Sequence, residues 1–247
     1  MSQRYIPVYQ TLGLWDTLPF GRGSWTNSYP FCSTTGQWTF NGRSALKLGL
    51  ATLDLQPNST ILVPNYFQGV EIETLVQNVF RLQFYRVDES LEVDLNDLEA
   101  KLTPETSVLY IIHYFGWPQK LRLIKDFCAR NELKLIEDCA LSLFSRDGND
   151  WLGTQGDFSI FSVYKTLPLP HGGYLVTKKA HPLPQLPRPP LLSTVRQTAD
   201  LIHEELRHSG WRMAEVVLKQ ASRTVRMLLP KKYPGSDLSS GGATWDV

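Results

Sequence analysis

The alternation of short apolar runs with amphipathic segments is the feature that most constrains the fold of this chain. Runs typical of buried strands occur at residues 59–64, 81–88, 107–116, 134–138, 158–163 and 173–178. Segments whose apolar residues have helical spacing lie between them, at residues 42–55, 69–78, 94–102 and 118–133. Because the runs are continuously apolar and helices separate most of them, the sequence predicts a three-layer α/β/α fold around a mostly parallel central sheet.

This regular pattern covers only part of the 247 residues and divides the chain into three predicted regions. Residues 1–40 are rich in aromatic residues, glycine and serine, and we expect an irregular N-terminal arm there. Residues 41–180 are the predicted α/β domain. Residues 181–247 combine a proline-rich linker, a segment of helical pattern and a tail without recognisable elements, which we expect to fray.

Composition and charge exclude several classes of protein. The formal net charge of +1 indicates no general field that would attract nucleic acid. No run approaches the ~20 apolar residues that a membrane-spanning helix needs. Three cysteines have no metal-type spacing, and we expect reduced core thiols, as in a cytoplasmic protein, and no metal site.

Several polar residues stand at the sheet edge where parallel α/β proteins bind their ligands. Asp138 ends the run at 134–138, and Lys165 follows the run at 158–163. The first regular helix opens with Gly42, Arg43 and Ser44, whose free N–H groups, hydroxyl and helix dipole suit a phosphate. We therefore expect a carboxylate, an amine and a phosphate-binding turn at one edge of the sheet.

These groups match the chemical needs of pyridoxal phosphate. Its aldehyde requires a lysine amine to form a Schiff base. Its pyridine nitrogen requires a neighbouring carboxylate in order to stay protonated and to act as an electron sink. Its ring requires a flat partner, and Tyr66 and Phe67, which follow the run at 59–64, are the two candidates.

Five sequence blocks resemble the DegT/DnrJ/EryC1/StrS sugar aminotransferases, which are pyridoxal-phosphate enzymes of fold type I. They are NGRSALKLGL, ILVPNYFQGVEIETL, VDLNDLEAKLTPETSVLYIIHYFG, LIEDCA and GTQGDFSIFSVYKTLPLPHGGYLVT. The blocks follow the family's order over residues 40–178. Each is weak alone, but the succession Glu-Asp, Gly-Asp, Ser-x-x-Lys and Gly-Gly is fairly specific.

The resemblance implies a role for each candidate residue. Lys165 falls on the Schiff-base lysine, Asp138 on the aspartate that pairs with the pyridine nitrogen, and Ser162 on a serine that helps to bind the phosphate. The remaining cofactor contacts implied by the resemblance fall on Gly42, Arg43, Ser44 and either Tyr66 or Phe67.

The chain also departs from the family pattern. Leu141 stands where a polar glutamine or histidine is usual, and the loop from Ser162 to Lys165 is two residues shorter than is common. We find no counterpart of the family's Asn-Tyr-Arg segment. Family members are longer, and we expect this chain to lack the C-terminal small domain that covers their substrate.

The activity implied by the resemblance is amino transfer, with glutamate as donor and a keto sugar on a nucleotide as acceptor. The resemblance also implies a homodimer and a role in polysaccharide biosynthesis. One alternative is a non-catalytic relative that serves as a binding or partner subunit. Another is a pyridoxal-phosphate dehydratase or lyase. Lys165 argues against the dehydratases of this family that carry a histidine in its place.

Ordinary structural roles are the alternatives for the individual side chains. Lys165 would then be an exposed loop lysine, and Asp138 would cap a short helix at 139–144. Ser44 would be a first-turn hydroxyl, and Tyr66 and Phe67 would belong to the core. His113 also ends a predicted strand, and we expect it to be packed or hydrogen-bonded.

Overall fold

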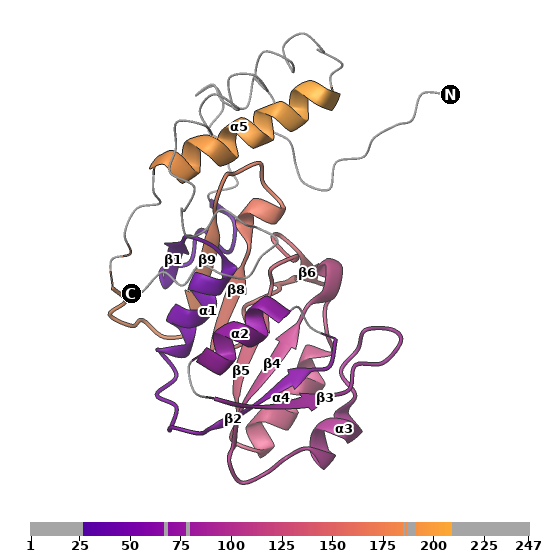
Figure 1. The fold of residues 1–247 in the computed structure, drawn as a ribbon. Coiled ribbons are helices and arrows are strands. Elements are labelled where there is room, and N and C mark those ends of the chain that lie inside the picture. Colours follow the sequence, from indigo (N-terminus) through magenta and orange to yellow (C-terminus); the bar gives the residue numbers. More distant parts are fainter. Residues whose placement is uncertain (1–26, 67–68, 78–79, 185, 187–190, 209–247) are drawn as a thin grey trace. The chain divides into compact units, whose positions relative to one another are not determined.

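The computed structural model of the protein describes residues 27–66, 69–77, 80–184, 186 and 191–208. The chain forms two compact units. One comprises Gly23–Val163 and Gly172–Leu186, and the other comprises Met1–Arg22, Tyr164–His171 and Pro187–Val247. The first unit contains the whole sheet, which Figure 1 shows with its helices.

A seven-stranded sheet in the order β1-β9-β8-β5-β4-β2-β3 is the framework of the first unit. Its strands are β1 (Gly36–Thr39), β2 (Thr60–Pro64), β3 (Arg81–Tyr85), β4 (Thr106–Ile112), β5 (Lys134–Asp138), β8 (Phe158–Phe161) and β9 (Gly173–Thr177). The five strands from β8 to β3 are parallel, whereas β9 runs antiparallel to both β8 and β1. The predicted mostly parallel α/β fold is confirmed.

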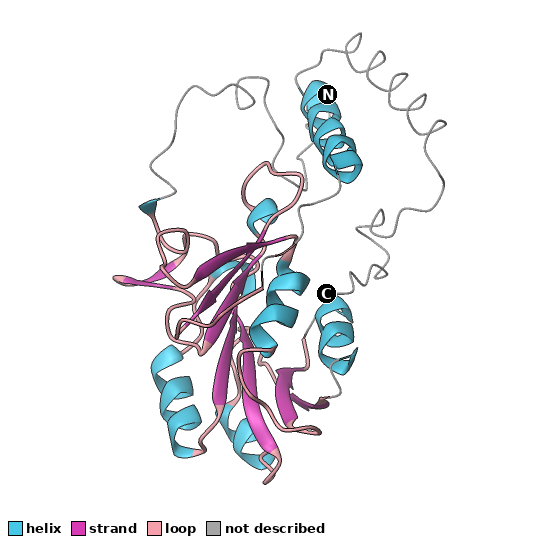
Figure 2. Ribbon diagram, turned by 90° about the vertical axis from the view of Figure 1, so that its left-hand side faces the viewer, coloured by secondary structure: helices cyan, strands magenta, loops and turns pink. Residues whose placement is uncertain are grey.

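Helices lie on both faces of this sheet, as the view in Figure 2 shows. In the first unit they are α1 (Gly42–Leu50), α2 (Gly69–Gln77), α3 (Leu95–Ala100) and α4 (Leu121–Arg130). A short hairpin of β6 (Arg146–Asp147) and β7 (Asp150–Trp151) precedes β8. In the second unit the structure describes α5 (Leu191–His208). Among the described residues, no helix has both the length and the apolarity to cross a bilayer.

Two local features differ from the sequence predictions. Strand β1 lies within residues 1–40, where the sequence predicts an irregular arm. Its pairing with β9 makes it a strand, and local periodicity does not indicate it. Helix α4 begins after Lys120, and not at Pro118, because Gln119 makes bonds outside the helix. The backbone N–H of Gln119 donates to Nδ1 of His113, and its side-chain amide donates to the carbonyl of Ile112.

The three cysteines are free thiols. Cys128 and Cys139 are buried, as expected, and burial raises the pKa of Cys128 to about 12. The expectation of a core position is wrong for Cys32, which is exposed.

The apolar core between α1 and the sheet shows which strand residues share a face. Side chains of alternate strand residues point to opposite faces, so residues two apart share one face. Core members of β4, β5 and β8 on the α1 face are Val108, Tyr110, Ile136, Phe158 and Ile160. They pack with Ala45, Leu46 and Leu48 of α1. This face of the sheet, which we call the α1 face, also carries the candidate site.

Candidate active site

Asp138 ends β5 at the carboxyl edge of the sheet, where sequence analysis predicts it. Its side chain is buried, at 5% exposure, and is two residues beyond Ile136, so it lies on the α1 face. The hydroxyl of Tyr110 donates to Oδ2 at 2.6 Å, and the backbone N–H of Ala140 donates to Oδ1 at 2.8 Å. Residues 139–144 form turns rather than the short helix of the alternative interpretation, and Asp138 caps no helix there.

The predicted phosphate-binding residues of α1 and β8 lie together. A β-carbon on Gly42 would stand only 2.5 Å from Oγ of Ser162, so the start of α1 and the residue after β8 touch. Ser162 is buried and lies two residues beyond Ile160, on the same face as Asp138. The structure therefore brings Gly42, Ser162 and Asp138 to one face at one edge of the sheet.

The N-cap of α1 leaves donors for an anion. Oδ1 of Asn41 accepts from the backbone N–H of Ser44 at 2.9 Å and from its hydroxyl at 3.1 Å. The cap does not use the N–H groups of Gly42 and Arg43, which belong to the first turn, where the dipole favours negative charge. Helix amides, a buried hydroxyl and a glycine without a side chain form a cradle that fits the phosphate of pyridoxal phosphate.

The aromatic candidates have different outcomes. Tyr66 is described and its side chain is 56% exposed, so it does not belong to the core. Its ring lies 5.6 Å from the ring of Tyr114, whose hydroxyl donates to the Tyr66 carbonyl at 2.5 Å. Phe67 lies outside the described residues. The choice of a stacking residue therefore stays a prediction.

Lys165 is the last residue of η4 (Val163–Lys165), a short 3₁₀ turn that begins two residues after the end of β8. It lies only three residues after Ser162 in the sequence, and its side chain is half-buried. Lys165 belongs to the segment Tyr164–His171 of the second unit, whereas Asp138 belongs to the first. That the amine of Lys165 faces Asp138 across the cofactor stays a prediction.

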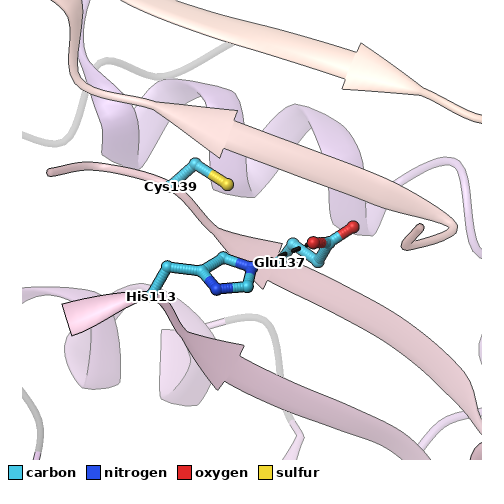
Figure 3. Close-up of side chains that lie close together, drawn as sticks. All are labelled: His113, Glu137 and Cys139. Atoms are coloured by element: carbon cyan, nitrogen blue, oxygen red, sulfur yellow. Dashed lines mark hydrogen bonds and ion pairs between the residues drawn. The ribbon is translucent and has the colours of Figure 1, made fainter. Parts of the chain in front are cut away.

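A second polar cluster lies on the opposite face of the sheet, and sequence analysis does not predict it. Glu137 is fully buried and, being adjacent to Asp138, points the other way. Figure 3 shows its carboxylate next to the ring of His113, with Cys139 close by. Nε2 of His113 lies 2.9 Å from Oε2 of Glu137.

Backbone amides complete the hydrogen bonding of Glu137. The N–H of Gly153 donates to Oε2 at 3.1 Å, and the N–H groups of Gln155 and Gly156 donate to Oε1 at 2.7 and 2.5 Å. The side chain thereby ties the end of β5 to the segment before β8. The expectation that His113 is hydrogen-bonded is confirmed.

His113, Glu137 and Cys139 are the one group of potential metal ligands that the described part of the chain brings together. Nδ1 of His113 accepts from the N–H of Gln119, which leaves the ring proton on Nε2, where it is donated to Glu137. Burial and the carboxylates of Glu137 and Asp138 raise the pKa of the Cys139 thiol, whereas metal ligation needs a thiolate. The cluster is thus satisfied by hydrogen bonds and offers no free lone pair of a ring nitrogen to a metal.

The sequence held a signal for part of this arrangement. A tyrosine in the aliphatic run Val-Leu-Tyr-Ile-Ile is unusual, because a buried hydroxyl needs a partner. That partner is Asp138, which is 28 residues away in the sequence. The pairing depends on the parallel register that places Ile112 beside Asp138.

Comparisons with known proteins show which family the chain resembles. Residues 36–182 match the model of the DegT/DnrJ/EryC1/StrS aminotransferase family. The chain is 30% identical over 140 residues to the GDP-perosamine synthase of Vibrio cholerae, covering 56% of this chain and 38% of that protein. It is 32% identical over 136 residues to the dTDP-4-dehydro-2,3,6-trideoxy-D-glucose 4-aminotransferase of Saccharopolyspora spinosa, covering 54% and 35%. The chain thus spans less than two fifths of the length of these relatives.

Solved structures support the same fold. AtS13 from Actinomadura melliaura superposes with a TM-score of 0.61 at 22% identity, covering 72% of this chain and 55% of that one. An aminotransferase from Psychrobacter cryohalolentis gives a TM-score of 0.56 at 24% identity, covering 63% and 39%. The family match spans more than half of the sequence, and the chain therefore belongs to the DegT/DnrJ/EryC1/StrS aminotransferase family.

Proposed function

We propose that this chain binds pyridoxal phosphate and forms the large domain of an aminotransferase that acts on sugar nucleotides. The observation that carries the proposal is the buried carboxylate of Asp138, on the sheet face where Gly42 meets Ser162. A negative charge at the sheet edge beside a phosphate cradle suits a cofactor with a cationic ring at one end and a dianion at the other.

Each residue has a distinct task in this proposal. Asp138 holds the proton on the pyridine nitrogen. Gly42, Arg43, Ser44 and Ser162 bind the phosphate through amides and hydroxyls. Lys165, by the family pattern, holds the cofactor aldehyde covalently and, once released, moves a proton to and from the substrate carbon as general base and acid.

Pyridoxal phosphate, when bound, supplies an electron sink for the carbon next to the transferred nitrogen. We infer glutamate as the amino donor and a keto sugar linked to a nucleotide as the acceptor. Support comes from the two relatives named above, whose names specify a GDP-linked and a dTDP-linked sugar. A homodimer is part of the same proposal.

The test is covalent capture of the cofactor. The chain mixed with pyridoxal phosphate should gain an absorption band near the visible edge, and borohydride followed by peptide mass spectrometry should find the cofactor on Lys165. K165A should lose both signals, whereas K178A, which changes an exposed lysine, should keep them. A wild-type chain that shows neither signal would refute the proposal.

One observation favours a second candidate, a family relative that binds but does not catalyse. Leu141, where the family has a polar residue, is an apolar side chain with 46% exposure, three residues after Asp138. Incubation with glutamate and a keto-sugar nucleotide separates the two candidates. The aminotransferase forms 2-oxoglutarate and an amino sugar, whereas the non-catalytic relative binds the cofactor without turnover.

A further inference from the structure

The phenol of Tyr110 donates a hydrogen bond to the carboxylate of Asp138. Tyr110 lies in the central strand β4, is fully buried, and donates to Oδ2 of Asp138 at 2.6 Å. The register of β4 and β5 pairs Tyr110 with Ile136 and Ile112 with Asp138, so the phenol reaches forward along the strand toward the carboxyl edge. Tyr110 and Asp138 therefore meet on the α1 face.

The phenol is itself held in place and keeps its proton. Burial, and then the negative charge of Asp138, raise the pKa of Tyr110 well above its usual value. Tyr110 is therefore a hydrogen-bond donor throughout the working pH range. The backbone carbonyl of Tyr110 also accepts from the hydroxyl of Tyr85 at 2.9 Å, which ties this part of β4 to β3.

Two donors from different elements define the plane of the carboxylate. Tyr110 in β4 binds Oδ2, and the backbone N–H of Ala140, in the turn after β5, binds Oδ1. A side chain whose rotation is already restricted loses little further freedom when a ligand binds, so its interaction with that ligand is stronger.

We propose that Tyr110 is a positioning residue, which orients the carboxylate of Asp138 toward the ring nitrogen of the bound cofactor. The inference rests on the proposed function, because it requires a pyridine ring beside Asp138. The residue acts through Asp138 and does not need to touch the cofactor. Its effect should therefore depend on the presence of the ring nitrogen.

The experiment compares two cofactors in the full chain. One is pyridoxal phosphate, and the other is its 1-deaza analogue, in which a C–H group replaces the ring nitrogen. Y110F removes only the hydroxyl and should raise the dissociation constant of pyridoxal phosphate about tenfold, because the Asp138 carboxylate would then lose more rotational freedom when the cofactor binds. The same variant should bind the deaza analogue as the wild type does.

Y85F is the matched control. It removes a hydroxyl from an equally buried tyrosine that bonds to a backbone carbonyl and not to Asp138. Y85F should reduce stability to urea while leaving the dissociation constant of pyridoxal phosphate unchanged. This control separates a loss of packing in the sheet from a loss of carboxylate orientation.

A double variant tests the route through Asp138. In the D138A background, Y110F should cause no further loss of pyridoxal-phosphate affinity. In the cofactor-free protein, the shift of the urea midpoint in the double variant should be smaller than the sum of the shifts caused by Y110F and D138A separately. The reason is that both substitutions remove the same hydrogen bond.

The outcomes are distinguishable. If wild type and Y110F bind pyridoxal phosphate equally, the positioning role is wrong and the proposed function stands. An equal loss for both cofactors would assign Tyr110 a purely structural role and would also overturn the inference. A wild-type chain that binds no pyridoxal phosphate would overturn the proposed function and this inference with it.

Discussion

At the scale of single residues, the contact between Gly42 and Ser162 decides whether the phosphate cradle is open. Gly42 begins α1 and Ser162 directly follows β8, and a β-carbon on Gly42 would lie 2.5 Å from Oγ of Ser162. A distance this short is well inside van der Waals contact, so the hydroxyl must rotate away if position 42 carries a side chain. A side chain at position 42 would therefore displace the Ser162 hydroxyl from its present place.

G42A should weaken pyridoxal-phosphate binding by roughly tenfold to a hundredfold, as expected when one hydrogen bond to a charged group is lost. The measurement is a titration of cofactor absorbance. G69A is the matched control, because Gly69 opens another nine-residue helix, α2, and a β-carbon there meets no atom within 4 Å. Equal affinities of G42A and G69A would show that Ser162 does not bind the phosphate.

At the scale of elements, Glu137 connects segments that the sequence keeps apart. Its carboxylate accepts from His113, which follows β4, and from the amides of Gly153, Gln155 and Gly156, which precede β8. Adjacent residues at the end of β5 therefore differ in position: Glu137 connects segments of the scaffold on one face, and Asp138 lies in the candidate site on the other. The alternation of side chains along a strand produces this division.

E137Q should lower the free energy of unfolding by about 3 kcal/mol. The glutamine amide has the shape of the carboxylate, but in either orientation its NH₂ group faces two donors and leaves them without an acceptor. Urea denaturation measures the effect. E99Q, at an exposed position of α3, is the control and should change stability by less than about 0.5 kcal/mol.

A stability of E137Q close to that of E99Q would contradict the network. It would mean that water or a rotated side chain replaces the lost acceptor. The prediction is independent of the cofactor, because it concerns the empty protein and the face of the sheet that is opposite to the α1 face.

At the scale of the whole sheet, burial is strongly uneven. The central strands β4 and β5 are buried along most of their length, whereas edge strand β3 exposes Arg81 and Phe84. Within the described part of the chain, β4 and β5 each pair with a neighbour on both sides, whereas β3 pairs only with β2. Local opening should therefore begin at the β3 edge.

Hydrogen exchange followed by mass spectrometry should show this gradient. Peptides that cover β4 and β5 should exchange their amide protons slowest, and the peptide that covers β3 should exchange earlier. Equal protection of β3 and β5 would indicate that another chain or segment covers the β3 edge.

The sequence alone determined the order of most strands and helices along the chain. Apolar periodicity is a local property, so it can be read without knowing the tertiary contacts. The sequence also predicted that Asp138, Ser162 and the first turn of α1 lie at one edge of the sheet, since residues that follow parallel strands share that edge. Strand β1 was not predictable, because its hydrogen-bonding partner β9 lies more than 130 residues away. Nor was the pairing of Tyr110 with Asp138, or of His113 with Glu137. Only the register of β4 on β5 decided which side chains share a face, and so which carboxylate lies in the candidate site and which supports the scaffold.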